Sequence, residues 1–87
     1  MDLGLAGKVA LITGGTSGIG LAIAQKLAAE GCAIAICGRD RVKLDEAASS
    51  LKSVKGFFAD IGKPADVAAL VDNVVASFGG IDIIMWT

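Results

Sequence analysis

Residues 8–20, KVALITGGTSGIG, decide the fold of this 87-residue chain. The first six form a nearly continuous apolar run, which is typical of a strand buried on both faces of a parallel sheet. Four glycines, at 14, 15, 18 and 20, then lead from this run into an amphipathic stretch. A strand that passes through a glycine-rich turn into a helix is the setting that a phosphate-binding turn requires.

Apolar runs and amphipathic stretches alternate along the rest of the chain. Strands are predicted at 8–13, 33–37, 54–59 and 81–86, and helices at 18–30, from a cap at Asp40 to Leu51, and from Pro64 to Phe78. This alternation predicts an α/β fold: half of a doubly wound parallel sheet, with four strands in the order 3-2-1-4 and three helices. The third helix is then expected on the opposite face of the sheet from the first two.

Each predicted helix has an apolar face at helical spacing. The expected inward residues are Ile19, Ala22, Ile23 and Leu27 in the first helix, Leu44, Ala47, Ala48 and Leu51 in the second, and Val67, Leu70, Val71, Val74, Val75 and Phe78 in the third.

Composition limits the classes of function. The chain is 54% hydrophobic, with a mean hydropathy of +0.69, so it carries more apolar surface than so small a domain readily buries. We therefore expect either self-association or a missing C-terminal portion to cover that surface. The net charge of −1 and the absence of like-charge runs predict neither a nucleic-acid partner nor a membrane partner. The start lacks the basic region of a secretory signal, so a cytoplasmic location is predicted.

The cysteines are expected to be inert. Cys32 and Cys37 are too far apart along one predicted strand to bridge each other, and the chain has no histidine. No metal site is predicted, and two small buried thiols in a cytosolic protein are the expectation.

Three glycines of the turn each have a predicted structural role. Gly14 permits a tight turn off the strand, Gly18 lets the backbone approach a pyrophosphate, and Gly20 lets helix and strand pack closely. The amides lining the bend and the positive end of the helix dipole would then face the phosphates, with Thr16 and Ser17 as hydroxyl donors. On this motif alone, a purely structural strand-to-helix turn remains the alternative.

The motif TGGTSGIG, with GRD at 38–40, AD at 59–60 and GGIDI at 79–83, resembles the N-terminal part of a short-chain dehydrogenase/reductase. The resemblance covers essentially the whole chain. It implies a Rossmann-type domain of roughly 250 residues, of which residues 1–87 would be the N-terminal, dinucleotide-binding part. It also implies hydride transfer between a nicotinamide and an alcohol or carbonyl, with the dinucleotide bound by Gly14, Thr16, Ser17, Gly18, Ile19 and Gly20.

Arg39 points to the form of the dinucleotide. It lies about 20 residues beyond the glycine motif, where an arginine accommodates the 2′-phosphate of NADP. Gly38 stands where relatives that bind NAD carry an acid. NADP is therefore the predicted cofactor, with NAD as the other possibility. The alternative for Arg39 is a solvated side chain paired with Asp40.

The resemblance also assigns roles after the third strand. In such relatives the carboxylate equivalent to Asp60 binds the adenine amino group, and the next residue, here Ile61, contributes its backbone. A turn-forming aspartate before Gly62 is an equal alternative for Asp60. Asp82 is interpreted as a strand-start or turn residue rather than a ligand.

The chain departs from the family pattern at its end. Trp86 and Thr87 take the places of two asparagines, and the family's catalytic serine, tyrosine and lysine would lie downstream. The chain contains no tyrosine and no histidine, so no catalytic residue is predicted and catalysis by these residues alone is not expected. Two alternatives stay open: a non-catalytic binding or oligomerisation module, and a truncated remnant.

Overall fold

The computed structural model describes residues 4–14, 18–51 and 53–86, and its strands and helices alternate as predicted. The strands are β1 (Val9–Thr13), β2 (Ala33–Gly38), β3 (Val54–Phe58) and β4 (Ile83–Met85), and the helices are α1 (Gly18–Ala29), α2 (Arg41–Ser49) and α3 (Pro64–Phe78). All strand pairs are parallel, and the order β3-β2-β1-β4 confirms the predicted 3-2-1-4 arrangement.

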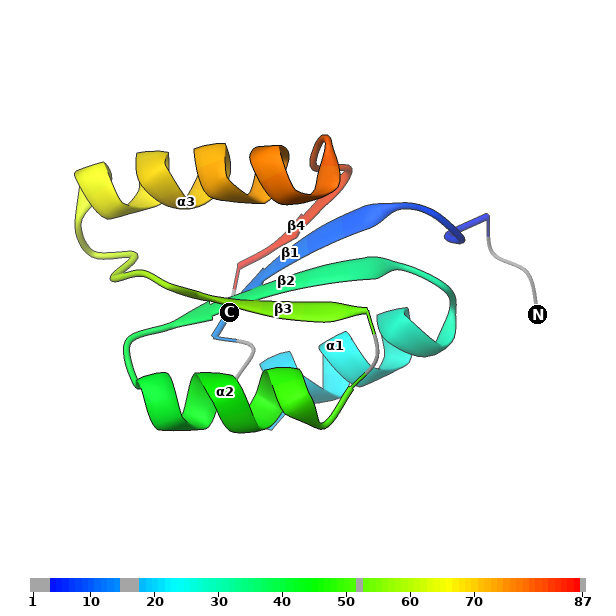
Figure 1. Ribbon diagram of the computed structural model, residues 1–87. Coiled ribbons are helices and arrows are strands. Elements are labelled where there is room, and N and C mark those ends of the chain that lie inside the picture. Colours follow the sequence, from blue (N-terminus) through cyan, green and yellow to red (C-terminus); the bar gives the residue numbers. More distant parts are fainter. Residues whose placement is uncertain (1–3, 15–17, 52, 87) are drawn as a thin grey trace.

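The sheet is the middle layer of three (Figure 1). Helices α1 and α2 cover one face and α3 covers the other, as the sequence predicts. Successive residues of β1 and β2 point to opposite faces, so their apolar runs supply both layers. The α1–α2 layer contains Ala10, Ile12, Ala24, Ile34, Ile36, Leu44 and Ala47, and the α3 layer contains Val9, Leu11, Ala35, Cys37, Leu70 and Val74.

The inward face of α1 agrees with the prediction in part, because Ile23 and Leu27 pack against the core whereas the other two predicted residues do not. Ile19 is 76% exposed and Ala22 is exposed, whereas Gly20 and Ala24 are buried. The prediction followed side-chain hydrophobicity. The most buried positions of the helix are the small residues Gly20 and Ala24, because small side chains allow the closest approach of helix and strand. The apolar stripe of α3 is confirmed except for Val75, which is 42% exposed at the edge of the stripe.

Capping explains where α2 begins and ends. The Asp40 carboxylate accepts hydrogen bonds from Val42 N at 3.0 Å and Lys43 N at 3.2 Å, which confirms Asp40 as the N-cap. The helix ends at Ser49, before the predicted Leu51, and the hydroxyl of the C-cap residue Ser50 donates to the Ala47 carbonyl at 2.8 Å. Such bonds compete with continued helix.

Strand β4 is shorter than the predicted 81–86, whereas the other strands lie within one residue of the prediction. Before β4 begins, Asp82 N donates to Val9 O and Val9 N donates to Asp82 Oδ2, both at 2.9 Å. At this position the Asp82 carboxylate, in place of a backbone carbonyl, accepts the Val9 N–H. The arrangement agrees with the interpretation of Asp82 as a strand-start residue.

Candidate functional site

A cavity of about 190 Å³ lies at the carboxyl ends of β1, β2 and β3. This edge is where open parallel sheets bind ligands, because the loops that leave adjacent strands diverge there. The lining residues come from all three strand ends: Gly14, Cys37, Gly38, Arg39, Ala59 and Ile61. Four of them were singled out from the sequence as cofactor contacts or as the cofactor-selecting position.

The glycine turn follows β1 directly. Gly14 has φ 68° and Gly18, the first residue of α1, has φ 60°, a left-handed conformation that suits glycine. Ile19 is exposed in the first turn of α1 and Gly20 is buried against the sheet. Thr16 and Ser17, the predicted hydroxyl donors, lie outside the described residues.

Cys37 forms part of the cavity lining and contacts the glycine turn. Its side chain is almost fully buried, and burial raises the pKa of the thiol, while a hydrogen bond with the Gly14 backbone acts in the opposite direction. Gly14 itself lines the cavity, and its contact with the dinucleotide stays a prediction.

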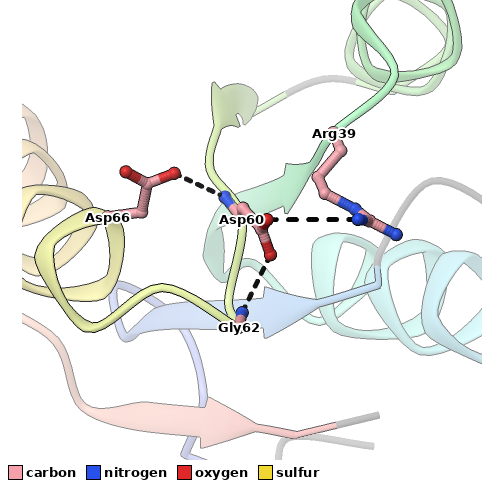
Figure 2. Close-up of polar contacts among 4 residues, drawn as sticks. All are labelled: Arg39, Asp60, Gly62 and Asp66. Carbon is pink, nitrogen blue, oxygen red and sulfur yellow. Dashed lines mark hydrogen bonds and ion pairs between the residues drawn. The ribbon is translucent and has the colours of Figure 1, made fainter.

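Arg39 extends from the end of β2 into solvent, with 74% of its side chain exposed. Its Nη1 lies 4.0 Å from Asp60 Oδ2, so its acidic neighbour is Asp60 (Figure 2). The alternative of a solvated Arg39 side chain agrees with this exposure, but its ion-pair partner is Asp60 and not Asp40, whose carboxylate caps α2. Exposed ion pairs contribute at most about 1 kcal/mol, so this contact leaves the guanidinium available to a stronger anion.

The loop after β3 places Asp60 and Ile61 beside Arg39. Asp60 Oδ1 accepts a hydrogen bond from Gly62 N at 2.9 Å, which is the turn-forming role considered from the sequence. Its other carboxylate oxygen faces Arg39, so the turn and a cavity role are compatible. Ile61 is half-buried and lines the cavity.

Sequence reasoning missed Asp66, whose Oδ2 accepts a hydrogen bond from Asp60 N at 3.0 Å (Figure 2). An acidic residue in the first turn of a helix is a common capping signal, and Asp66 occupies that position in α3. The sequence thus contained a capping signal at Asp66, but this signal does not indicate which backbone N–H the Asp66 carboxylate accepts.

Other groups lie away from the cavity. Cys32 is buried in the layer under α1 and α2, and burial, followed by the nearby Glu30 and Asp82 carboxylates, raises the pKa of its thiol. Within residues 4–14, 18–51 and 53–86, no group of three potential metal ligands comes together. Among the described residues, no helix is both long enough and apolar enough to span a membrane.

A family model described as short chain dehydrogenase matches residues 8–86. This chain belongs to the short-chain dehydrogenase family. Among its relatives, human dehydrogenase/reductase SDR family member 4 is 41% identical over 85 residues, which cover 93% of this chain and 31% of that protein. The chain thus spans about a third of that relative's length.

Two solved structures of short-chain dehydrogenase relatives share the fold. L-sorbose reductase from Gluconobacter frateurii, complexed with NADPH and L-sorbose, is 48% identical with a TM-score of 0.91, covering 97% of this chain and 34% of that one. The 3-ketoacyl-(acyl-carrier-protein) reductase from Brucella melitensis, complexed with NADH, is 40% identical with a TM-score of 0.88, covering 92% of this chain and 33% of that one. Both forms of nicotinamide dinucleotide therefore occur among these relatives.

Proposed function

We propose that this chain binds NADP(H) as the dinucleotide-binding part of a short-chain oxidoreductase. The observation that carries the proposal is the cavity where Gly14, Gly38 and the guanidinium-bearing Arg39 meet at the carboxyl ends of three parallel strands. Relatives that share this fold are complexed with NADH or NADPH, which supports the ligand class.

The start of α1 fits the diphosphate. The first amides of any α-helix lack partners within the helix, and its dipole favours an anion there. Within the described part of the chain, no heavy atom lies within 4 Å of the position that a Cβ on Gly18 would take. That open space beside the backbone would let a phosphate approach the Gly18 and Ile19 amides, with Gly20 holding α1 against the sheet. Thr16 and Ser17 remain predicted donors.

Arg39 and Gly38 favour NADP over NAD. A guanidinium forms charge-assisted hydrogen bonds to a 2′-phosphate, and Gly38 places no carboxylate at the cavity to repel it. Asp60 and Ile61 would border the adenine end. The relatives named above include both an NADH and an NADPH complex, so the preference rests on these residues of the chain itself.

The bound nicotinamide would exchange a hydride with an alcohol or carbonyl. The chain would hold the dinucleotide without completing that reaction, because its 87 residues contain neither tyrosine nor histidine to move the accompanying proton. Residues 1–87 would then be the N-terminal part of one longer domain, in the cytoplasm. Turnover of NADPH with simple ketones by the purified chain would contradict the proposed lack of catalysis.

Calorimetric titration of the 87-residue chain with NADPH and with NADH tests binding. We expect NADPH to bind at least tenfold more tightly, because a hydrogen bond to a charged group contributes about 1.5–3 kcal/mol. Arg39→Ala should remove that preference and leave the NADH affinity within twofold. Lys43→Ala, which removes an exposed cation from α2, is the control for net charge. Absence of binding by either dinucleotide would reject the proposal.

Self-association through β4 is a second candidate. Ile84 is 57% exposed and Trp86 is 64% exposed, and β4 lies at one edge of the sheet. Sedimentation velocity of the chain and of Ile84→Lys, across a range of concentrations, tests it. A monomer at all concentrations for both proteins would reject this candidate.

A further inference from the structure

Asp66 makes a contact that standard helix capping does not explain. It is the third residue of α3, where a carboxylate usually accepts the backbone N–H of the N-cap residue. Here the N-cap residue is Lys63, and its N–H donates instead to the Asp60 carbonyl at 3.0 Å. The Asp66 carboxylate reaches past the N-cap and accepts the N–H of Asp60 at 3.0 Å.

These bonds shape the cavity loop, defined here as residues 59–63. Two of them lie inside the loop: Lys63 N to Asp60 O at 3.0 Å, and Gly62 N to Asp60 Oδ1 at 2.9 Å. They set the loop's internal turn. Backbone bonds anchor its two ends, since Ala59 N donates to Gly38 O and Val67 N donates to Lys63 O, each at 3.1 Å. The Asp66 bond joins the loop to the first turn of α3 (Figure 2). The buried Leu70 and Val74 pack this helix against the sheet.

The cavity loop forms one side of the proposed dinucleotide site. Ala59 and Ile61 line the cavity together with Arg39 from β2, and Asp60 Oδ2 lies 4.0 Å from the Arg39 Nη1 atom. A shift of this loop changes the width of the cavity and the surroundings of the guanidinium together. Whatever holds the loop therefore also holds the site.

We propose that Asp66 is a positioning residue, whose carboxylate accepts the Asp60 N–H and so fixes the cavity loop as the wall against the adenosine end of the dinucleotide. This inference rests on the proposed function, which places the 2′-phosphate at Arg39. Asp66 itself does not line the cavity, so it acts through Asp60. Without its bond, the loop keeps its internal turn and the backbone bonds at its two ends, but residues 60–62 lose their link to α3 and must be ordered when the ligand binds, which weakens affinity.

The test is titration of the 87-residue chain and its Asp66 variants with NADPH, with 2′,5′-ADP and with nicotinamide mononucleotide. Asp66→Ala should weaken NADPH and 2′,5′-ADP by about tenfold, the value of one lost hydrogen bond to a charged group. Nicotinamide mononucleotide, which lacks the adenosine end, should be unaffected. Asp66→Asn keeps an acceptor oxygen and should stay within threefold of wild type. Asp72→Ala, exposed on the same helix, is the matched control.

A double-mutant cycle separates loop positioning from an effect through the Asp60 carboxylate. Asp60→Ala keeps the backbone N–H that Asp66 accepts, so Asp66→Ala should weaken 2′,5′-ADP by about tenfold in this background as well. A further loss of less than twofold would contradict positioning through the backbone. If Asp66→Ala does not fold, Asp66→Ser removes the same bond while keeping a residue that suits a helix start.

The outcomes are distinct. Wild type that binds neither NADPH nor 2′,5′-ADP overturns the proposed function and this inference with it. Wild-type binding with an unchanged affinity in Asp66→Ala or Asp66→Ser overturns the positioning role alone. So does an Asn variant as weak as the Ala variant, or an equal loss for nicotinamide mononucleotide.

Discussion

Asp82 joins the start of β4 to the start of β1 through both its backbone and its side chain. Val9 N donates to Asp82 Oδ2 and Asp82 N donates to Val9 O, each at 2.9 Å, although the two residues are 73 positions apart. Val9 is only 7% exposed, so its N–H has little access to water. Replacing the carboxylate by a methyl group would leave this amide without its acceptor.

The expected loss of folding stability in Asp82→Ala follows from the burial of the Val9 N–H. A buried donor left unsatisfied costs about 1–3 kcal/mol, and because Asp82 itself is exposed, water entering from its side should hold the loss near about 1–2 kcal/mol for Asp82→Ala. For a domain of this size, each 1 kcal/mol lowers Tm by about 4–8 °C. Asp82→Asn retains an acceptor oxygen and should lose less than about half as much.

Urea unfolding provides the measurement. Far-UV circular dichroism follows the whole fold, while the fluorescence of Trp86, the single tryptophan, reports on the end of β4. Coincident transitions shifted to lower urea would show global destabilisation, and an earlier fluorescence transition would show that β4 detaches first. Asp72→Ala controls for removal of an exposed carboxylate. An Asp82→Ala protein as stable as wild type would refute the reasoning.

Two further predictions concern the interior. Gly56→Ala should destabilise by about 1–3 kcal/mol, because the new Cβ would lie 2.8 Å from Leu44 Cγ. In a Leu44→Ala background, Gly56→Ala should reduce the free energy of urea unfolding by less. An equal reduction there would show that contact with Leu44 is not the cause. Stability should fall above about pH 9, because burial keeps the Cys32 and Cys37 thiols protonated in the folded state while they ionise in the unfolded one. A Cys32→Ala/Cys37→Ala variant should lose less stability over the same pH range. An identical loss would show that the two thiols are not its cause.

Sequence reasoning was most successful where the relevant pattern is local. Apolar runs and helical spacing predicted that every strand and helix exists, and Asp40 and Pro64 marked helix starts because capping depends on residues a few positions apart. The sheet order also followed, since the handedness of crossovers leaves few arrangements for this alternation. Family membership rested on the same local motifs and is confirmed.

Side-chain partners were harder to predict. Arg39 was considered a partner for its neighbour Asp40, but parallel pairing of β2 and β3 brings Asp60 beside it instead. Ile19 was expected to face the sheet because it is apolar, yet close packing selects Gly20 and Ala24. The reach of Asp66 to Asp60 depends on the exact path of one loop, which no periodicity encodes.

By itself, the sequence determined the alternation of elements, the glycine turn and the family, because each depends on short-range steric and hydrophobic patterns. Tertiary structure alone decided that Cys37 lines the cavity together with Gly14, that the Asp82 carboxylate accepts the Val9 N–H, and that Asp66 joins the cavity loop to α3. The physical reason is that these contacts join atoms whose proximity exists only after strands pair and helices pack on the sheet.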